Sequence, residues 1–215
     1  MSLARYYSLP LYYSVKCFYF RKLICSRCEL TKTLSSLKDN GKLDSIEMDH
    51  NLLTSQSLSS LPSSLTLLNL SFNLLKDIPP TVLALNLLLS LNVSSNRLTS
   101  LVGLESLTSL IDLNADDNLI AEIPSEVATI LTLRHISLQR NSITSRALSF
   151  EGQSIHESVF RSSNIEAINL SGNPVTKADL IRFEGVESFL ERRKRAKDKS
   201  LLTGAATDLE LFGLS

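Results

Sequence analysis

Three residues of the types used in nucleophilic catalysis recur at intervals of 22 and 23 residues: Ser90, Asp112 and His135. A catalytic triad needs the histidine between the serine and the aspartate, because the imidazole must reach both groups. If the chain folds into stacked turns of this length, Asp112 lies in the middle instead. The order therefore predicts a cross-strand pair between Asp112 and His135, and we expect no enzymatic activity.

Cys25 and Cys28 form a C-x-x-C pair, with Cys17 and His50 as candidate third and fourth ligands of a metal ion. Structural zinc sites usually contain two such pairs, so a single pair favours free thiols. Three cysteines also cannot build a disulfide framework. We expect no metal, no cofactor and no small-molecule substrate, and no glycine-rich loop for phosphate binding occurs.

The chain that carries these residues is self-similar. The pattern L-x-x-L-x-L-x-x-N occurs six times, with Ile, Val, Met or Ala allowed at the Leu positions. The Asn-to-Asn spacings are 22, 23, 22, 23 and 32 residues, and the copies end at Asn51, Asn73, Asn96, Asn118, Asn141 and Asn173. This pattern is the leucine-rich repeat. With 43 Leu among 215 residues, stacked copies can build a continuous apolar core.

The repeat predicts an α/β fold, a right-handed leucine-rich repeat solenoid. Short parallel strands form its concave face, and short helical or 3₁₀ turns form its convex face. Because side chains alternate along a strand, Leu68 and Leu70 point into the core. The asparagines are expected to form a structural ladder by bonding the backbone of their own and adjacent turns. Pro80 and Pro124 suit the first turn of convex helices.

Positions three, five, seven and eight of each copy, counted from its first Leu, are predicted to point outward and form the concave face. The set mixes acidic and apolar residues, which suits a protein partner that carries basic residues. The predicted contact residues are Glu47, Asp49, Leu67, Asn69, Phe72, Asn92, Asp112, Asn114, Asp116, Asp117, His135, Ser137, Gln139, Arg140 and Asn169.

The pattern divides the chain into four parts. Residues 1–33 are expected to form a poorly ordered N-terminal extension or a partial cap, and residues 34–175 form the solenoid. Residues 176–199 are expected to be a C-terminal capping helix with a basic end, and residues 200–215 a tail. The capping helix is placed at Lys177–Arg195, with Phe183 and Phe189 over the core.

The last spacing is longer because it contains an insert, residues 142–164. One interpretation is a longer convex loop or helix that leaves the coil intact. The other is a contact surface of its own, and the composition of the insert does not separate the two.

The segment Arg182–Lys199, RFEGVESFLERRKRAKDK, resembles the tail of small intracellular leucine-rich repeat proteins. These are leucine-rich repeat-containing protein 57 and the plant intracellular Ras-group-related leucine-rich repeat proteins. The resemblance spans about residues 34–199, and in the tail it rests on Gly185, Phe189, Arg192, Arg193, Lys197, Asp198 and Lys199. It implies a non-enzymatic interaction module whose partners are mostly undefined, and it suggests a GTPase or phosphatase pathway component as the class of partner.

Charge and hydropathy narrow the function further. The net charge is zero, but residues 41–175 carry a net charge of −6, which disfavours nucleic-acid binding there. No stretch reaches the ~20 apolar residues that span a bilayer. The basic run 192–199 indicates either a nuclear-localisation patch or a solvated helix end.

These observations predict a cytoplasmic scaffold or adaptor that binds a protein partner through the concave face, with a nuclear location as the alternative. The alternative function is an assembly or regulatory subunit that contacts partners through the insert 142–164 or the basic C-terminal tail.

Overall fold

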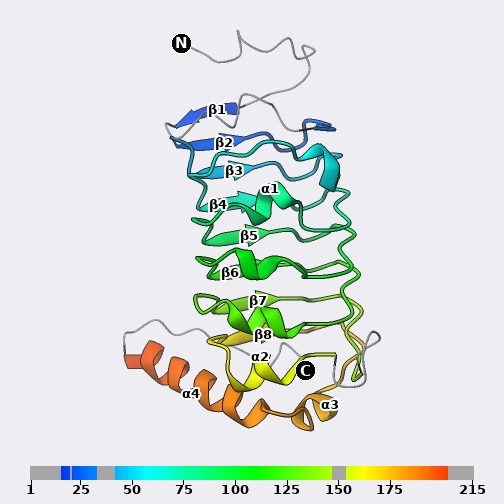
Figure 1. The fold of residues 1–215 in the computed structure, drawn as a ribbon, viewed down its shortest axis with the longest axis vertical. Helices are drawn as coiled ribbons and strands as arrows, with labels where there is room; N and C mark the ends of the chain where they lie inside the picture. The colour runs from blue at the N-terminus through cyan, green and yellow to red at the C-terminus, as the bar shows by residue number, and fades with distance from the viewer. Residues whose placement is uncertain (1–15, 20, 33–41, 147–153, 203–215) are drawn as a thin grey trace.

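The computed structural model describes residues 16–19, 21–32, 42–146 and 154–202. Eight short strands form one sheet in the order of the sequence, stacked along the long axis of the molecule (Figure 1). The first pair is antiparallel and every later pair is parallel. The strands are β1 (Lys16–Tyr19), β2 (Lys22–Ile24), β3 (Ser45–Glu47), β4 (Leu67–Asn69), β5 (Ser90–Asn92), β6 (Asp112–Asn114), β7 (His135–Ser137) and β8 (Ala167–Asn169).

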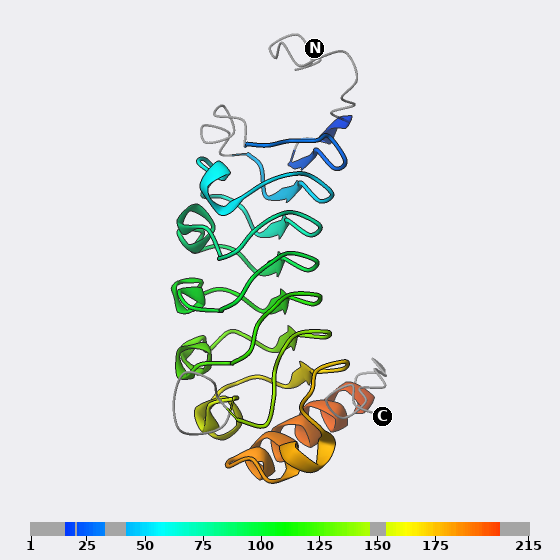
Figure 2. The ribbon, with the colours of Figure 1, turned by 90° about the vertical axis from the view of Figure 1, so that its right-hand side faces the viewer.

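Short helices return the chain from one strand to the next. Figure 2 shows the strands along one side of the coil and these helices along the other. They are η3 (Ser55–Ser57), α1 (Pro80–Leu83), η4 (Leu104–Ser106), η5 (Ser125–Thr129) and α2 (Glu157–Arg161). Pro80 is the first residue of α1 and Pro124 is the N-cap of η5, as expected for residues that lack an amide donor. The predicted α/β leucine-rich repeat solenoid is confirmed.

The core is a column of side chains from the middle of each strand. The parallel register places Leu68 beside Leu91, and Leu113 beside Ile136, so that each buried side chain packs on its counterparts in the neighbouring turns. Each fully buried Leu or Ile contributes roughly 1.5–3 kcal/mol relative to exposure. A single turn cannot bury its own apolar side chains, so the stability of each turn depends on its neighbours.

The asparagine ladder runs along the end of the strands. The amide nitrogen of Asn118 donates to the carbonyls of Ala115 and Asp116 in its own turn and to Val93 in the preceding turn, at 3.0–3.1 Å. Its Oδ1 accepts a hydrogen bond from the backbone N–H of Leu98 at 2.9 Å. The amides of Asn51, Asn73, Asn96, Asn141 and Asn173 likewise donate to a carbonyl of their own turn and to one of the preceding turn.

The sheet begins before the first copy that the sequence pattern identified. Strand β2 pairs in parallel with β3, and Leu23, Cys25 and Cys28 are buried in the core. Cys28 occupies the asparagine position of this first turn. Its thiol donates to the carbonyl of Ser26 at 3.3 Å, the bond to residue i−2 that an asparagine amide makes in the other turns. Residues 22–28 are therefore part of the coil and not of a poorly ordered extension, whereas the alternative of a partial cap over 1–33 stays a prediction.

Cys25 and Cys28 thus occupy the inner-leucine and asparagine positions of the repeat. Neither Cys25 nor Cys28 is in a disulfide, and their separation by three residues reproduces the interval between inner Leu and Asn. Within the described ranges, no group of three or more His, Cys, Asp or Glu side chains could hold a metal ion. The side chain of Cys17 and residues 1–15 lie outside what the structure describes.

The second half of the insert forms convex structure. Ile155 makes a parallel bridge with Ile123, and α2 follows with Val159 and Phe160 buried. Ile136 and Ile168 remain paired across β7 and β8, so the register of the sheet is unchanged. This agrees with a longer convex segment that leaves the coil intact, and residues 147–153 lie outside the described ranges.

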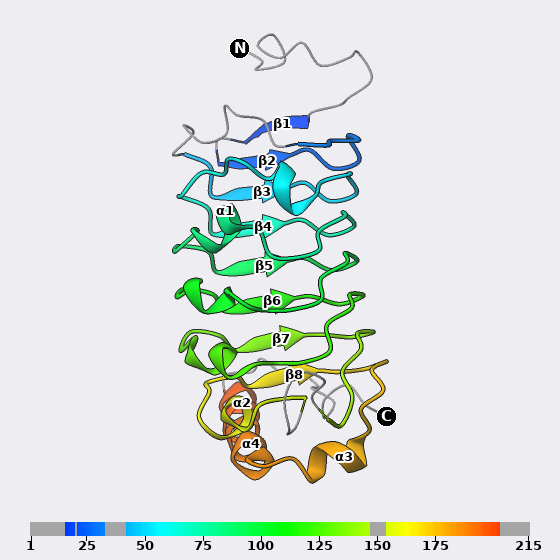
Figure 3. The same cartoon turned by 45° about the vertical axis from the view of Figure 1, so that its right-hand side comes forward.

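The C-terminal cap consists of α3 (Lys177–Ile181) and α4 (Val186–Leu202), which cover the last turn in Figure 3. The single helix predicted over Lys177–Arg195 is wrong, because Gly185 has φ +85° and interrupts it. A Cβ atom at Gly185 would lie 3.1 Å from the backbone nitrogen of Arg161, so the close approach also requires glycine. Thr176 and Asp179 form the expected capping box.

Phe183 and Phe189 of the cap are buried, as predicted. Both contact Phe160 of α2, with ring centroids 6.1 and 5.8 Å away. The end of the solenoid is therefore covered by an aromatic cluster. In the ranges that the structure describes, no helix is long and apolar enough to cross a membrane.

Candidate functional site

The concave face is built from very short strands. Each parallel strand contains three residues, so positions three and five project outward and the intervening residue is buried. Positions seven and eight follow the strand, where the chain turns before the ladder residue. The face is therefore a grid of side chains, one row for each turn, with neighbouring rows about 4.8 Å apart.

Position three carries both apolar and charged side chains. Leu67 is 47% exposed and is aligned with Ser45 and Ser90. The Nδ1 atom of His135 lies 2.6 Å from Oδ1 of Asp112, which confirms the predicted cross-strand pair. Ser90 pairs with Asp112 in the backbone register, so the aspartate separates the serine from the histidine. This order does not support acyl transfer.

Lys22 extends this face toward the N-terminus. Its ammonium group lies 2.6 Å from the carboxylate of Glu47, which occupies position five of the next turn. Lys22 and Ser26 were missed by the sequence analysis because their turn carries cysteines where leucine and asparagine were sought. The signal that could have found them is the 23-residue interval between Cys28 and Asn51.

Four of the predicted contact residues at position five also hold the backbone. The Oδ1 atoms of Asn69, Asn92, Asn114 and Asn169 each accept a hydrogen bond from the N–H two residues further on, at 3.0–3.1 Å. This is the local bond of an Asx turn, and it helps to end the strand. For a partner, these side chains still offer their NH₂ groups.

Asp116 differs from the other predicted contact residues because it is only 8% exposed. Its carboxylate accepts hydrogen bonds from the Ser137 hydroxyl and the Gln139 backbone N–H, both at 2.7 Å. The Gln139 side chain adds a third bond at 3.3 Å. Asp116 therefore joins two adjacent turns, and Ser137 and Gln139 are held by it.

Asp49 occupies the same position seven nearer the N-terminus. It accepts hydrogen bonds from the Ser26 hydroxyl at 2.5 Å and lies 2.9 Å from His50 Nδ1. Burial alone would raise the pKa of the Asp49 carboxyl, but the hydrogen bonds from Ser26 and His50 outweigh it and lower the pKa. The ionised carboxylate thus connects the first turn to the second.

Every copy places position eight in the left-handed region. The φ values are +50° to +55° for the non-glycine residues and +75° for Gly172; the set is Arg27, His50, Phe72, Ser95, Asp117, Arg140 and Gly172. A non-glycine residue in this conformation costs on the order of 1 kcal/mol. The ladder asparagine that follows, or Cys28 in the first turn, bonds the same turn and stabilises it.

The side chains at position eight form two cross-turn pairs. The rings of His50 and Phe72 stack with centroids 4.1 Å apart, and Phe72 remains 50% exposed. Arg140 donates to both carboxylate oxygens of Asp117, at 2.5 and 2.6 Å. These hydrogen bonds lower the pKa of Asp117 and raise that of Arg140.

The fold and this face define a leucine-rich repeat solenoid protein, and comparison with solved structures supports that class. The chain is similar to a leucine-rich repeat protein of Leptospira interrogans, with 18% identity and a TM-score of 0.59 over 80% of this chain. An internalin from Listeria monocytogenes matches over 73% of the chain, with 19% identity and a TM-score of 0.48.

The chain spans about half the length of these proteins, 47% and 56% respectively. Searches against protein families and curated proteins find no match. At 18% identity, the similarity to the Leptospira protein shows the fold alone. The finer resemblance to leucine-rich repeat-containing protein 57 and the plant Ras-group-related proteins stays a prediction.

Proposed function

We propose that this protein is a non-enzymatic interaction module that binds a protein partner through the concave face. The observation that carries the proposal is the exposure of Leu67 and Phe72, 47% and 50%, on a face where several charged side chains are paired across the turns. Solvent-exposed apolar side chains beside charged pairs are typical of the centre and rim of a protein interface.

The size of the face sets how the partner binds. Seven parallel strands at ~4.8 Å spacing give a length of about 29 Å, and strand residues alone cover less than the ~800 Å² that a standard partner surface buries. Position eight widens the grid, which brings the His50–Phe72 stack into the proposed site. The partner therefore contacts both the strands and the turns that follow them.

Charge determines which partner fits. Glu47 and Asp112 are partly exposed, and each bonds one cation or imidazole on its neighbour. Since exposed pairs of this kind contribute only ~0.2–1 kcal/mol, a partner's Lys or Arg can replace Lys22 or His135 at little cost. We expect a protein surface with apolar anchors for Leu67 and Phe72 and basic residues around them. A GTPase or phosphatase pathway component is the partner class that the sequence resemblance favours.

Partner capture from cells with matched surface variants tests this proposal. Leu67→Asp with Phe72→Asp should remove the partners that the wild-type protein retains, and rebinding of each purified partner should weaken at least tenfold. The control is Val102→Asp with Leu131→Asp, which adds the same charge at exposed apolar residues of the convex segments. Equal losses for the two double variants, or none for the first, would place binding elsewhere.

The alternative function is contact through the insert or the basic tail. Some side chains of both segments are already buried against the solenoid. Val159 and Phe160 of the insert are buried, and so is Arg193 in the basic run. Partner loss in a variant that lacks residues 147–153, with the concave face intact, would favour this alternative.

A further inference from the structure

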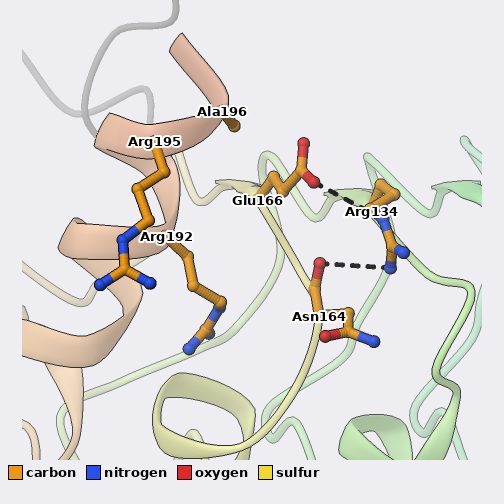
Figure 4. Close-up of a pocket in the computed structure, with 6 residues that line it drawn as sticks. All are labelled: Arg134, Asn164, Glu166, Arg192, Arg195 and Ala196. Carbon is orange, nitrogen blue, oxygen red and sulfur yellow. Dashed lines mark hydrogen bonds and ion pairs between the residues drawn. The ribbon is translucent and has the colours of Figure 1, made fainter. Parts of the chain in front are cut away.

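A second candidate site lies between the C-terminal helix α4 and the chain that leads into β7 and β8. A cavity of about 250 Å³ opens there, lined by Arg134, Asn164, Glu166, Arg192, Arg195 and Ala196. Figure 4 shows the α4 residues on one side of it and Arg134, Asn164 and Glu166 on the other. None of these residues belongs to the concave face.

The lining is strongly basic. Three arginines and one glutamate line the cavity, so these residues carry an excess of two positive charges. Arg134 Nε lies 3.5 Å from the carboxylate of Glu166, too far for a strong charge-assisted hydrogen bond. Arg195 lies at the mouth, largely exposed, and contacts Glu191 of its own helix at 3.4 Å. The cavity therefore holds more positive charge than its own carboxylate balances.

Arg192 is the central cation of this cavity. Its guanidinium donates to the carbonyls of Ile165 and Val159 at 3.4 Å and to the Ser163 hydroxyl at 3.5 Å, all neutral acceptors at the limit of hydrogen bonding. The guanidinium carbon also lies 5.8 Å from the centroid of the Phe189 ring. No carboxylate pairs with it among the described residues, and burial lowers the pKa of Arg192. A partly buried cation without a counter-ion favours an anion beside it.

The charge and size of the cavity indicate which anion. A phosphate monoester carries a charge of about −1.5 to −2 at pH 7, which matches the excess charge of the lining, and three acceptor oxygens for its donors. A carboxylate brings only one charge. Ligand pockets usually enclose ~300–1,000 Å³, so this cavity suits a single group rather than a whole cofactor. We propose that it binds a phosphate monoester group.

Titration of the full-length protein with inorganic phosphate tests the proposal, with acetate at matched ionic strength as the comparison. Saturable phosphate binding that acetate does not reproduce is the expected result. Arg195→Gln should weaken it about tenfold, because one charge-assisted hydrogen bond is lost. Arg192→Gln should weaken it at least as much, and a thermal melt will show whether the cap still docks in that variant.

Two further variants separate binding from a general effect of charge. Arg182→Gln removes an exposed positive charge from the same cap outside the cavity, and should leave the affinity unchanged. Glu166→Gln removes the competing carboxylate and should tighten phosphate binding several-fold. Loss of affinity in Arg182→Gln equal to that in Arg195→Gln, no gain in Glu166→Gln, or equal binding of acetate would overturn the proposal.

A short peptide that contains phosphoserine identifies the source of the group. Tighter binding of this peptide than of inorganic phosphate indicates a phosphorylated protein side chain, and equal or weaker binding indicates a free phosphate compound; either result supports the site. Because the concave-face variants do not touch this cavity, its failure and the failure of the proposed function can be told apart.

Discussion

The two ends of the solenoid close the same apolar core by different means. At the N-terminal end the repeat continues through β2, and β1 adds an antiparallel strand to the edge of the sheet. At the C-terminal end the sheet stops at β8, and α3 and α4 cover the last turn with phenylalanine side chains. One end extends a backbone ladder, whereas the other buries aromatic area.

This difference predicts unequal stability. The first turn is held by backbone bonds such as Cys25 N–H to Glu47 C=O at 2.8 Å and Arg27 N–H to Asp49 C=O at 3.0 Å, with exposed ion pairs beside them. A hydrogen bond contributes ~1 kcal/mol net, while burial of a large aromatic side chain contributes several times more. In a solenoid each turn contacts only its neighbours, so we expect unfolding to start from the N-terminal end.

The largest effect is expected at the C-terminal end. Phe189→Ala removes a fully buried ring that contacts Phe160, and should lower the free energy of unfolding by about 3–5 kcal/mol. Urea denaturation measures this change. Ile181→Ala, at an exposed position of α3, is the control and should cost far less. Similar losses in both variants would show that the aromatic cluster does not hold the cap.

A smaller effect is expected in the middle of the ladder. Asn118→Ala leaves the N–H of Leu98 without its acceptor and removes one of the two asparagine donors to each of the carbonyls of Val93 and Ala115. The expected loss is about 3 kcal/mol, because the unpaired Leu98 N–H costs ~1–3 kcal/mol and each lost bond to a carbonyl costs ~0.5–1.5 kcal/mol. Thermal or urea unfolding will test it, and a loss below 1 kcal/mol would contradict the role of the ladder.

The first turn should respond less than the middle. Cys28→Ala removes a buried thiol and its one bond to Ser26, so the expected loss is about 1 kcal/mol. Burial raises the pKa of the Cys28 thiol, which should also make it slow to react with iodoacetamide at pH 8 in the native protein. If Cys28→Ala destabilises as much as Asn118→Ala, the first turn is not held more weakly than the middle of the ladder.

The smallest expected effect is on the loss of stability at acidic pH. Asp49, Asp117 and Asp179 have pKa values below the ordinary value of an aspartate, Asp117 and Asp179 chiefly through hydrogen bonds to Arg140 and Thr176. Their stabilisation is present above pH ~3.9 and is lost as the pH falls through their lower folded pKa values. Asp117→Asn and Asp179→Asn should each flatten the decline of stability with acid in this range, as followed by circular dichroism. An unchanged slope would contradict these assignments.

The sequence predicted the part of the fold that repeats. Period and residue type alone located the six ladder asparagines, the buried leucines and the Asp112–His135 pair. The first turn was not predicted because it carries a cysteine where the other turns carry asparagine. In addition, the C-x-x-C spacing resembles that of a metal site. Gly185 escaped because apolar residues keep helical spacing on both sides of it, and its positive φ depends on the contact with Arg161 in another element.

The candidate sites could be predicted only in part. Alternation correctly placed Leu67 and Phe72 on the surface, but it also placed Asp116 there. The Asp116 side chain is buried, and its carboxylate accepts a hydrogen bond from the backbone N–H of Gln139 in the next turn. The arginine-lined cavity could not be predicted, since it arises from the docking of α4 against the starts of two strands. Such contacts depend on the angle of the cap, which no local pattern encodes.

The ladder also makes the length of this molecule adjustable. Each asparagine bonds only its own turn and the one before it, so removal of the 23 residues from Leu74 to Asn96 would rejoin chemically equivalent points. The shortened chain would lose one row of the binding grid and about 4.8 Å of length, while both closures stay intact. The number of turns, and with it the length of the concave face, can therefore change while the contacts between neighbouring turns stay the same.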